Sequence, residues 1–220
     1  MTKKLQKVKK IVIVGAGGFG KEVLSTILAC NRIQKQFDVL GFIDDDENLK
    51  GSSINDFPIL GNVDWLLSSD LFPLGCVIAI GEPKIRKKIQ ARLETRDLRF
   101  PKIIHPSVII SEFTSIEDGT IIQAGSIISP NIKIGKYVFV NVNSTIGHDC
   151  ILEDFVTVGP GCMISGENIV EEGVFFGNGV MTRDKIKIGK WSFIGAGSVV
   201  GKSIHEKSIQ FAASGILKSF

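Results

Sequence analysis

A six-residue period runs through the second half of the chain and constrains its fold more than any other feature. Every sixth residue from Ile104 to Val200 is Ile, Leu or Val at fifteen of seventeen positions, and the register never slips. Glycine directly follows seven of these positions: Gly135, Gly147, Gly159, Gly177, Gly189, Gly195 and Gly201. Hexapeptide repeats of this kind build a parallel β-helix, whose short strands stack into coils around an aliphatic interior. The repeat therefore predicts this fold for residues 101–220.

The first hundred residues alternate strand-like and helix-like segments instead. Three apolar runs predict buried parallel strands, at 10–18, 37–46 and 76–81. Two stretches with helical spacing predict helices, at 21–31 and 82–96. In the second helix, Ile85, Ile89 and Leu93 are expected to face inward. This alternation predicts a small parallel sheet of about four strands covered by helices, a Rossmann-like α/β domain over residues 1–100.

The composition argues against several classes of partner. The chain has 26 Lys and Arg against 23 Asp and Glu, and a net charge of +3 is too small to indicate nucleic-acid or membrane binding. Much of the excess lies in MTKKLQKVKK (1–10), which we expect to be a solvated lead-in to the first strand. No signal-peptide segment follows it, and no apolar run is long enough to span a bilayer. The four cysteines lack CxxC spacing, which argues against disulfides and zinc knuckles and favours a reduced, cytoplasmic location.

Two motifs carry chemistry. In NSTIGHDCILEDF (143–155), His148 lies two places after the inward-facing Ile146, so the register puts it at an outward corner, where it has no use in core packing. A plain surface turn residue is the alternative. The turn GAGGFG (15–20) follows a strand and precedes a helix, as a dinucleotide-binding turn requires. An oxidoreductase is nevertheless a weak interpretation, because the sheet is short and the β-helix offers no hydride-transfer chemistry.

The two halves, in this order, resemble the bacterial sugar acetyltransferases, which include sialic acid O-acetyltransferases and nucleotide-amino-sugar N-acetyltransferases. The resemblance covers nearly the whole chain and rests on the hexad array and on IVIVGAGGFGKEV, GFIDDD, IAIGEPKIRKKI and NSTIGHDCILEDF. It implies a left-handed β-helix with three hexads per coil and a homotrimer with active sites in grooves between neighbouring β-helices. It also implies that acetyl-CoA lies along the groove and that the N-terminal domain holds the acceptor's nucleotide or sugar.

The same resemblance implies roles for individual residues. His148 is the expected general base and Asp149 orients it and raises its basicity, in direct transfer through a ternary complex without an acyl-enzyme. Expected acceptor contacts are Gly17, Gly18, Phe19, Asp44, Asp45 and Gly81. A polar strand end is the alternative for 44–46. Expected acetyl-CoA contacts are Thr157, Gly166, Asn178 and Ala196, and the 18-residue spacing of Gly159, Gly177 and Gly195 suggests a glycine column beside the cofactor. Glycine is also simply common at that hexad position.

The chain departs from its relatives in three places. Phe19 and Thr157 stand where relatives commonly carry histidine, and the ending ASGILKSF (213–220) lacks the usual GxPAK. Lys190, Lys202 and Lys218 are plausible phosphate partners, although surface lysines usually have no such function. Outward apolar residues such as Val142, Phe155 and Phe175 offer a surface that a neighbouring subunit could cover.

The other two histidines are weaker candidates. His105 is expected to shape the entry to the repeat, and His205 to be exposed in a segment after it. Their separations from His148 are 43 and 57 residues, neither a multiple of an 18-residue coil, so a histidine metal site is not expected. The predicted function is acetyl-CoA-dependent N-acetylation of a nucleotide-linked amino sugar. O-acetylation of a sialic acid or similar sugar, and a non-catalytic sugar-nucleotide-binding or scaffold protein, remain alternatives.

Overall fold

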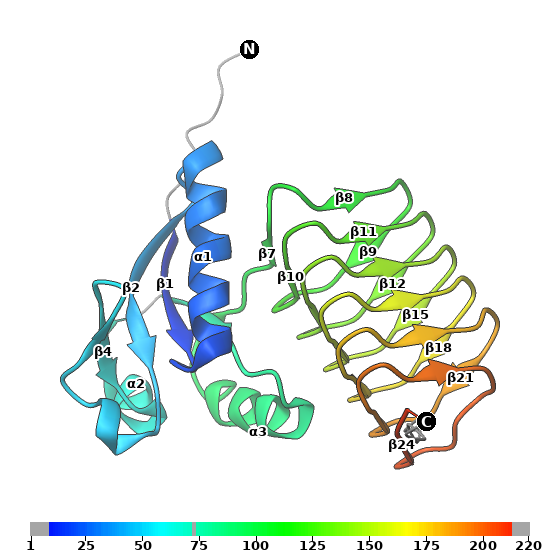
Figure 1. Ribbon diagram of the computed structural model, residues 1–220. Coiled ribbons are helices and arrows are strands. Elements are labelled where there is room, and N and C mark those ends of the chain that lie inside the picture. Colours follow the sequence, from blue (N-terminus) through cyan, green and yellow to red (C-terminus); the bar gives the residue numbers. More distant parts are fainter. Residues whose placement is uncertain (1–8, 72–73, 213–220) are drawn as a thin grey trace, which may run out of the picture.

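The computed structural model describes residues 9–71 and 74–212. Figure 1 shows an open sheet with helices, coloured blue to green, beside a long prism of stacked coils, coloured green to red. The predicted lead-in at 1–8 and the ending ASGILKSF, with Lys218, lie outside the described residues. The two-part α/β and β-helix fold predicted from the sequence is confirmed. No helix within the described ranges is long and apolar enough to cross a bilayer.

The N-terminal sheet has the order β3-β4-β2-β1-β5-β6 within the described residues, and all neighbours are parallel except β3 and β4. The strands are β1 Lys9–Val14, β2 Phe37–Ile43, β3 Ser53–Ile54, β4 Phe57–Gly61, β5 Leu74–Ile78 and β6 Leu98–Arg99. The predicted strands at 10–18, 37–46 and 76–81 correspond to β1, β2 and β5. The estimate of about four strands was too low, because β3 and β6 are only two residues long and give no periodic signal.

Three α-helices are present in the described residues: α1 Gly18–Ile33, α2 Val63–Ser68 and α3 Pro83–Leu93. A short 3-10 helix spans Glu47–Leu49. The predicted inward face of α3 is confirmed at Ile89 and Leu93 but wrong at Ile85, which is 51% exposed. Arg86 is buried in its place. The reason is tertiary: α3 lies against the β-helix as well as the sheet, and Arg86 donates there to the backbone carbonyls of Phe155 and Val156.

The second half is a left-handed parallel β-helix made of three sheets of two-residue strands. The first sheet contains β7 Ile103–Ile104, β10 Ile121–Ile122, β13 Phe139–Val140, β16 Thr157–Val158, β19 Phe175–Phe176, β22 Phe193–Ile194 and β24 Ile209–Gln210. The second contains β8 Ile109–Ile110, β11 Ile127–Ile128, β14 Thr145–Ile146, β17 Met163–Ile164, β20 Met181–Thr182 and β23 Val199–Val200. The third contains β9 Ser115–Ile116, β12 Lys133–Ile134, β15 Ile151–Leu152, β18 Ile169–Val170 and β21 Lys187–Ile188.

Successive strands of each sheet pair in register at 18 residues, as Ile121 does with Phe139. Three hexads therefore make one coil, as expected. The second residue of each strand faces the interior, where the aliphatic core is almost completely buried from Ile122 to Val200. The six-residue period thus records the inward positions directly.

The last coil is shorter than the others. Phe193 pairs with Ile209, and Ile188 bridges Ile204, so the offset falls to sixteen residues. The prediction that His205 lies after the repeat was therefore wrong, because the coil continues past it; its exposure is confirmed. Because this coil is two residues shorter than the others, the six-residue period stops before it and the sequence pattern does not reveal it.

The N-terminal half docks on the first sheet of the β-helix through aromatic and aliphatic contacts. The rings of Phe19 and Phe139 lie 3.8 Å apart between centroids, and the hydroxyl of Thr26 in α1 donates to Gln123. Tyr137 stacks on Phe155 at 5.2 Å, and Lys87 of α3 lies over the Phe155 ring. The prediction that Phe155 forms free surface was wrong, because the chain's own α3 covers it. Val142 and Phe175 stay partly exposed.

Candidate active site

His148 and Asp149 lie on the turn between β14 and β15, at the corner that joins the second and third sheets. Ile146, two residues before His148, and Cys150, directly after Asp149, are fully buried in the β-helix interior. The side chains of His148 and Asp149 are 58% and 49% exposed. The register thus directs both polar side chains outward, as the sequence predicts.

The two side chains are hydrogen bonded to each other. Nδ1 of His148 lies 2.8 Å from Oδ2 of Asp149. An ionised carboxylate only accepts hydrogen bonds, so this contact assigns the proton of a neutral imidazole to Nδ1 and leaves the Nε2 lone pair free. The hydrogen bond from His148, with a second from Asn131, lowers the pKa of Asp149 below its ordinary value, so the carboxylate stays ionised over the whole neutral range.

Gly166 lies directly beside the imidazole ring, one coil further along. A Cβ atom at this position would be 2.6 Å from Nε2 of His148 and 2.8 Å from Cε1. The backbone of Gly166 is not in the left-handed region, so its own conformation does not require glycine. The resemblance implies that Gly166 contacts the cofactor. The structure brings Gly166 to His148, where the missing side chain makes room for the ring.

The glycine column is present, and backbone packing explains it. A Cβ atom on Gly159 would lie 2.8 Å from the carbonyl carbon of Gly177, and one on Gly177 would lie 2.6 Å from the amide of Ala196. The coils approach each other too closely here for any side chain. Close coil packing therefore accounts for these glycines without a cofactor.

The predicted cofactor residues fall at two different corners of the prism. Asn178 and Ala196 are exposed beside the glycine column, on the turns that join the first sheet to the second. Gly166 and His148 lie on the turns that join the second sheet to the third. The whole second sheet separates these corners within one chain, so a single copy does not bring all of them together.

Thr157 and Arg86 form a buried link between the two halves. Thr157 is 3% exposed, and its hydroxyl donates to the Gly81 carbonyl at 2.7 Å and accepts from Nη2 of Arg86 at 2.9 Å. Thr157 thus lies beneath the N-terminal half, with its hydroxyl already paired, and the structure does not bring it to His148.

Arg86 is a residue that the sequence reasoning missed. Its guanidinium group also donates to the carbonyls of Ile80, Gly81 and Phe155 at 2.6, 3.0 and 2.7 Å. Burial lowers its pKa to about 9. Arg86 lies three residues before Ile89 and seven before Leu93, and this helical spacing could have placed it on the buried face.

The glycine turn before α1 contains two kinds of glycine. Gly15 has a φ of +104°, and a Cβ on Gly20 would lie 2.1 Å from the Gly15 carbonyl, so the fold requires both. Gly17 and Gly18 are exposed and have open space where a Cβ would lie. No acidic residue lies in the first turn of α1 and no side chain caps it, so the backbone N–H groups of this turn are of the kind that bind phosphate. Phe19 points elsewhere, against Phe139.

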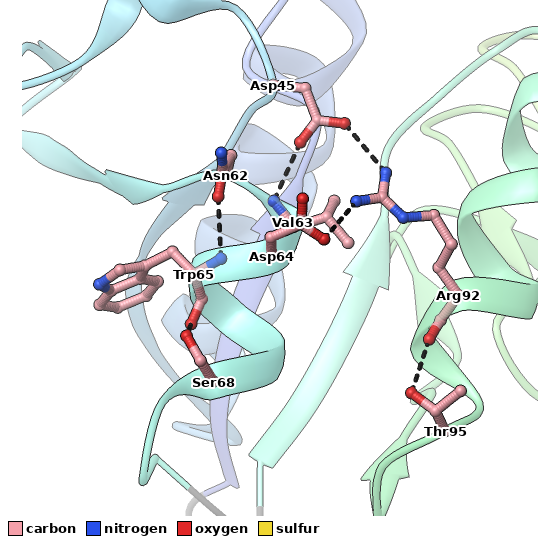
Figure 2. Close-up of polar contacts among 8 residues, drawn as sticks. All are labelled: Asp45, Asn62, Val63, Asp64, Trp65, Ser68, Arg92 and Thr95. Carbon is pink, nitrogen blue, oxygen red and sulfur yellow. Dashed lines mark hydrogen bonds and ion pairs between the residues drawn. The ribbon is translucent and has the colours of Figure 1, made fainter.

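The carboxylates that follow β2 are engaged within the N-terminal half. Asp44 accepts from the backbone N–H of Ala16 at 2.7 Å and so supports the glycine turn. Asp45 accepts from the backbone N–H of Val63 at 2.9 Å and pairs with Arg92 at 3.2 Å, as Figure 2 shows. Arg92 also binds Asp64 at 2.8 Å. These contacts fit the polar strand end that the sequence left open as an alternative.

The remaining candidates are peripheral to this geometry. Gly81, which follows β5, is partly exposed and has open space where a Cβ would lie. Ala79, two residues before it, lies against Gly15 of the glycine turn. Lys190 pairs with Glu206 at 3.3 Å, and Lys202 is exposed. Nδ1 of His105 accepts from the backbone N–H of Ser107 at 3.1 Å and shapes the entry to the repeat as predicted. Among the described residues, no three His, Cys, Asp or Glu side chains converge as metal ligands would.

Comparison with known proteins agrees with this architecture. The family described as the PglD N-terminal domain matches residues 10–93, and the family described as bacterial transferase hexapeptide (six repeats) matches residues 131–166. GDP-perosamine N-acetyltransferase of Escherichia coli O157:H7 is 29% identical over 143 residues, which span 64% of this chain and 63% of that relative. The match thus covers less than two thirds of the relative's length.

Two solved structures match over almost their full length. A histidine-to-asparagine variant of perosamine N-acetyltransferase from Caulobacter crescentus, in complex with CoA and GDP-perosamine, has a TM-score of 0.85 at 25% identity and covers 93% of this chain and 94% of its own. The acetyltransferase domain of PglB from Neisseria gonorrhoeae FA1090, in complex with acetyl coenzyme A, has a TM-score of 0.83 at 27% identity and covers 92% and 96%. Over almost its full length the chain thus resembles bacterial sugar acetyltransferases that carry hexapeptide repeats.

Proposed function

We propose that this protein transfers the acetyl group of acetyl-CoA to the amine of a nucleotide-linked amino sugar. The observation that carries the proposal is the His148–Asp149 pair, with Nδ1 bound to the carboxylate and Nε2 free at an exposed corner. Relatives that match over almost the full chain have been solved with CoA, acetyl-CoA and GDP-perosamine. A second solved form of the C. crescentus relative carries a histidine-to-alanine change.

In the proposed step, Nε2 of His148 takes a proton from the amino group as its nitrogen attacks the thioester carbonyl. A C–N bond forms, the C–S bond of the collapsing tetrahedral intermediate breaks, and CoA leaves as a thiolate that receives from Nε2 of His148 the proton that the amine lost. Asp149 stabilises the imidazolium that forms between these events and fixes the ring orientation. The transfer is direct, without an acyl-enzyme.

The N-terminal half, which we assign to residues 1–100, would hold the acceptor. The backbone at the exposed residues Gly17 and Gly18 suits a diphosphate, and Gly81, which follows β5, is a further candidate contact. Asp44 and Asp45 hold this region in shape and keep lone pairs that can accept from a nucleoside. We assign transfer to residues 101–220, with acetyl-CoA along the corners that carry Gly166, Asn178 and Ala196.

We further propose that the working unit is a homotrimer. Five of the six outward residues of the second sheet are apolar and exposed, with Thr145 between the second and third of them: Ile109, Ile127, Met163, Met181 and Val199, which are 59, 41, 50, 38 and 62% exposed. Burying such a row against a second copy would be stabilising. It would also bring the corner with His148 in one copy to the corner with Asn178 in the next, which a single chain keeps apart. The buried free thiols suit a reduced cytoplasm.

Thiol release from acetyl-CoA, measured against GDP-, UDP- and dTDP-linked amino sugars and against sialic acid, tests the proposal. We expect turnover with at least one nucleotide-linked amino sugar and its loss in His148→Ala. Turnover with sialic acid alone would favour O-acetylation. Binding of a nucleotide sugar without turnover of any acceptor would favour a non-catalytic protein. Full activity in His148→Ala would refute the mechanism.

A further inference from the structure

We propose that Asn131 is a positioning residue that fixes the Asp149 carboxylate and, through it, the imidazole of His148. The proposal rests on the proposed function, since it deepens the account of the same site. Asn131 was not among the residues that the sequence pointed to, because it lies 17 residues before His148 and in a different hexad.

The contact divides the carboxylate between two partners. Nδ2 of Asn131 donates to Oδ1 of Asp149 at 3.1 Å, while Oδ2 faces Nδ1 of His148 at 2.8 Å. An exposed carboxylate with one partner can rotate about its terminal torsion, which is broad. With each oxygen bound, rotation breaks at least one hydrogen bond. The amide therefore holds the orientation in which Oδ2 meets the ring.

Coil stacking explains why these two side chains meet. Asn131 and Asp149 occupy the same turn position one coil apart, with φ of 62° and 58°. Backbone hydrogen bonds join each of these turns to the coil before it, as from Asp149 to the Pro130 carbonyl at 3.1 Å. The two side chains thus leave parallel backbones at coil spacing, about 4.8 Å apart. An amide is long enough to bridge this gap to a carboxylate.

Asn131 and Asp149 belong to a column of residues at the same turn position in successive coils. The charges in this column favour a neutral donor at position 131. The next members are Glu167 and Lys185, which pair with each other at 3.4 Å and so balance the charge beyond Asp149. Further charged groups on the adjoining coils are Glu112, Lys133, Arg183 and Asp184, the last two paired at 3.7 Å. A lysine at 131 would compete with the imidazolium for Asp149, whereas an amide supports the carboxylate without neutralising it.

The test compares Asn131→Gly with Asn55→Gly. Both remove an exposed asparagine at positive φ (62° and 48°), where glycine adds no backbone strain, but Asn55 lies in the β3–β4 turn of the N-terminal half. Asn131→Asp, of nearly the same shape, replaces the donor with an acceptor. Two readouts are used: steady-state kinetics over pH, and NMR of the histidine ring nitrogens and of the aspartate carboxyl carbons, assigned with His148→Ala and Asp149→Asn.

We expect Asn131→Gly to lower kcat about three- to tenfold, the usual effect of losing one hydrogen bond to a charged group at an exposed site, with an unchanged KM for acetyl-CoA. The Asp149 carboxyl should titrate at higher pH in both variants, further in Asn131→Asp. The acidic limb of kcat/KM in Asn131→Gly should move to lower pH, because a carboxylate that is no longer held in place stabilises the imidazolium less. Asn55→Gly should match the wild type. Unchanged kcat and unchanged Asp149 titration in Asn131→Gly would overturn the proposal. If the wild type turns over no acceptor, the proposed function fails, while the NMR titration still decides the role of Asn131.

Discussion

Substituting Gly166 with alanine tests the position of the His148 ring, because the atoms nearest the added Cβ all belong to that ring. The added Cβ would lie 2.6 Å from Nε2, 2.8 Å from Cε1 and 3.0 Å from Cδ2, whereas ordinary contacts begin near 3.4 Å. The ring must therefore move by about 0.8 Å, since the alternative is to move the backbone of a stacked coil. Alanine is compatible with the backbone conformation at 166.

The size of the effect follows from that movement. The hydrogen bond between His148 and Asp149 is 2.8 Å long, and a ring displaced by about 0.8 Å cannot keep both the geometry of this bond and the present position of Nε2. Misplacing a reacting group by about 1 Å costs on the order of 10²-fold in rate. We therefore expect kcat in Gly166→Ala to fall roughly 100-fold. Stability should change by less than about 1 kcal/mol, because alanine restricts the unfolded chain while the displaced ring and its disturbed hydrogen bond act in the opposite direction.

The assay is thiol release with the best acceptor, together with thermal unfolding. Gly201→Ala is the control, because Gly201 also lies on a turn that follows the second sheet, has no positive φ and has open space around its Cβ position. A raised KM for acetyl-CoA with unchanged kcat would show that Gly166 contacts the cofactor instead. Full activity of Gly166→Ala would refute the conclusion that His148 works from the position seen here.

Three further outcomes are expected. Asp149→Asn should lower kcat about 10²- to 10⁴-fold and move the acidic limb of kcat/KM to lower pH, because a neutral amide no longer stabilises the imidazolium; a pH profile that keeps its acidic limb would contradict this. Arg86→Met should cost about 2–4 kcal/mol in urea unfolding, because buried carbonyls of Ile80 and Phe155 lose their donor, while the exposed Arg32→Met stays near wild type. Met163→Glu should give monomers in light scattering, whereas Ile85→Glu, equally exposed but on α3, keeps the trimer; trimers in both would place the interface elsewhere.

The β-helix could be predicted because its coils stack along a single axis. Each coil packs on the coil before and after it, so a residue's environment follows from its place in the period. The same logic correctly placed His148 outside, two residues after Ile146. It failed in the last coil, where sixteen residues replace eighteen and the period is lost although the stacking continues.

The contacts between the two halves could not be predicted in this way. Ile85 follows the helical pattern yet is exposed, and Phe155 points outward from the β-helix yet is buried. Both outcomes depend on where α3 lies on the coils, which is a long-range property. The amide of Asn131 was missed for a related reason. The 18-residue spacing predicts that Asn131 lies next to Asp149 on the adjacent coil, but it does not predict the hydrogen bond between their side chains.

The docked N-terminal half has a consequence for how the β-helix fluctuates. It covers Ile103, Ile121, Phe139 and Thr157, which belong to four successive coils, whereas Phe193 and Ile209 on the same sheet are 39 and 67% exposed. Stacked coils lose order from the end that has fewer neighbours. Amide hydrogen exchange should therefore be slowest in the first coils and quicken stepwise towards β24. The corner with His148 lies among the coils where exchange should be slow, so its geometry would persist. The distal coils would meanwhile open and close locally around the far end of a long ligand.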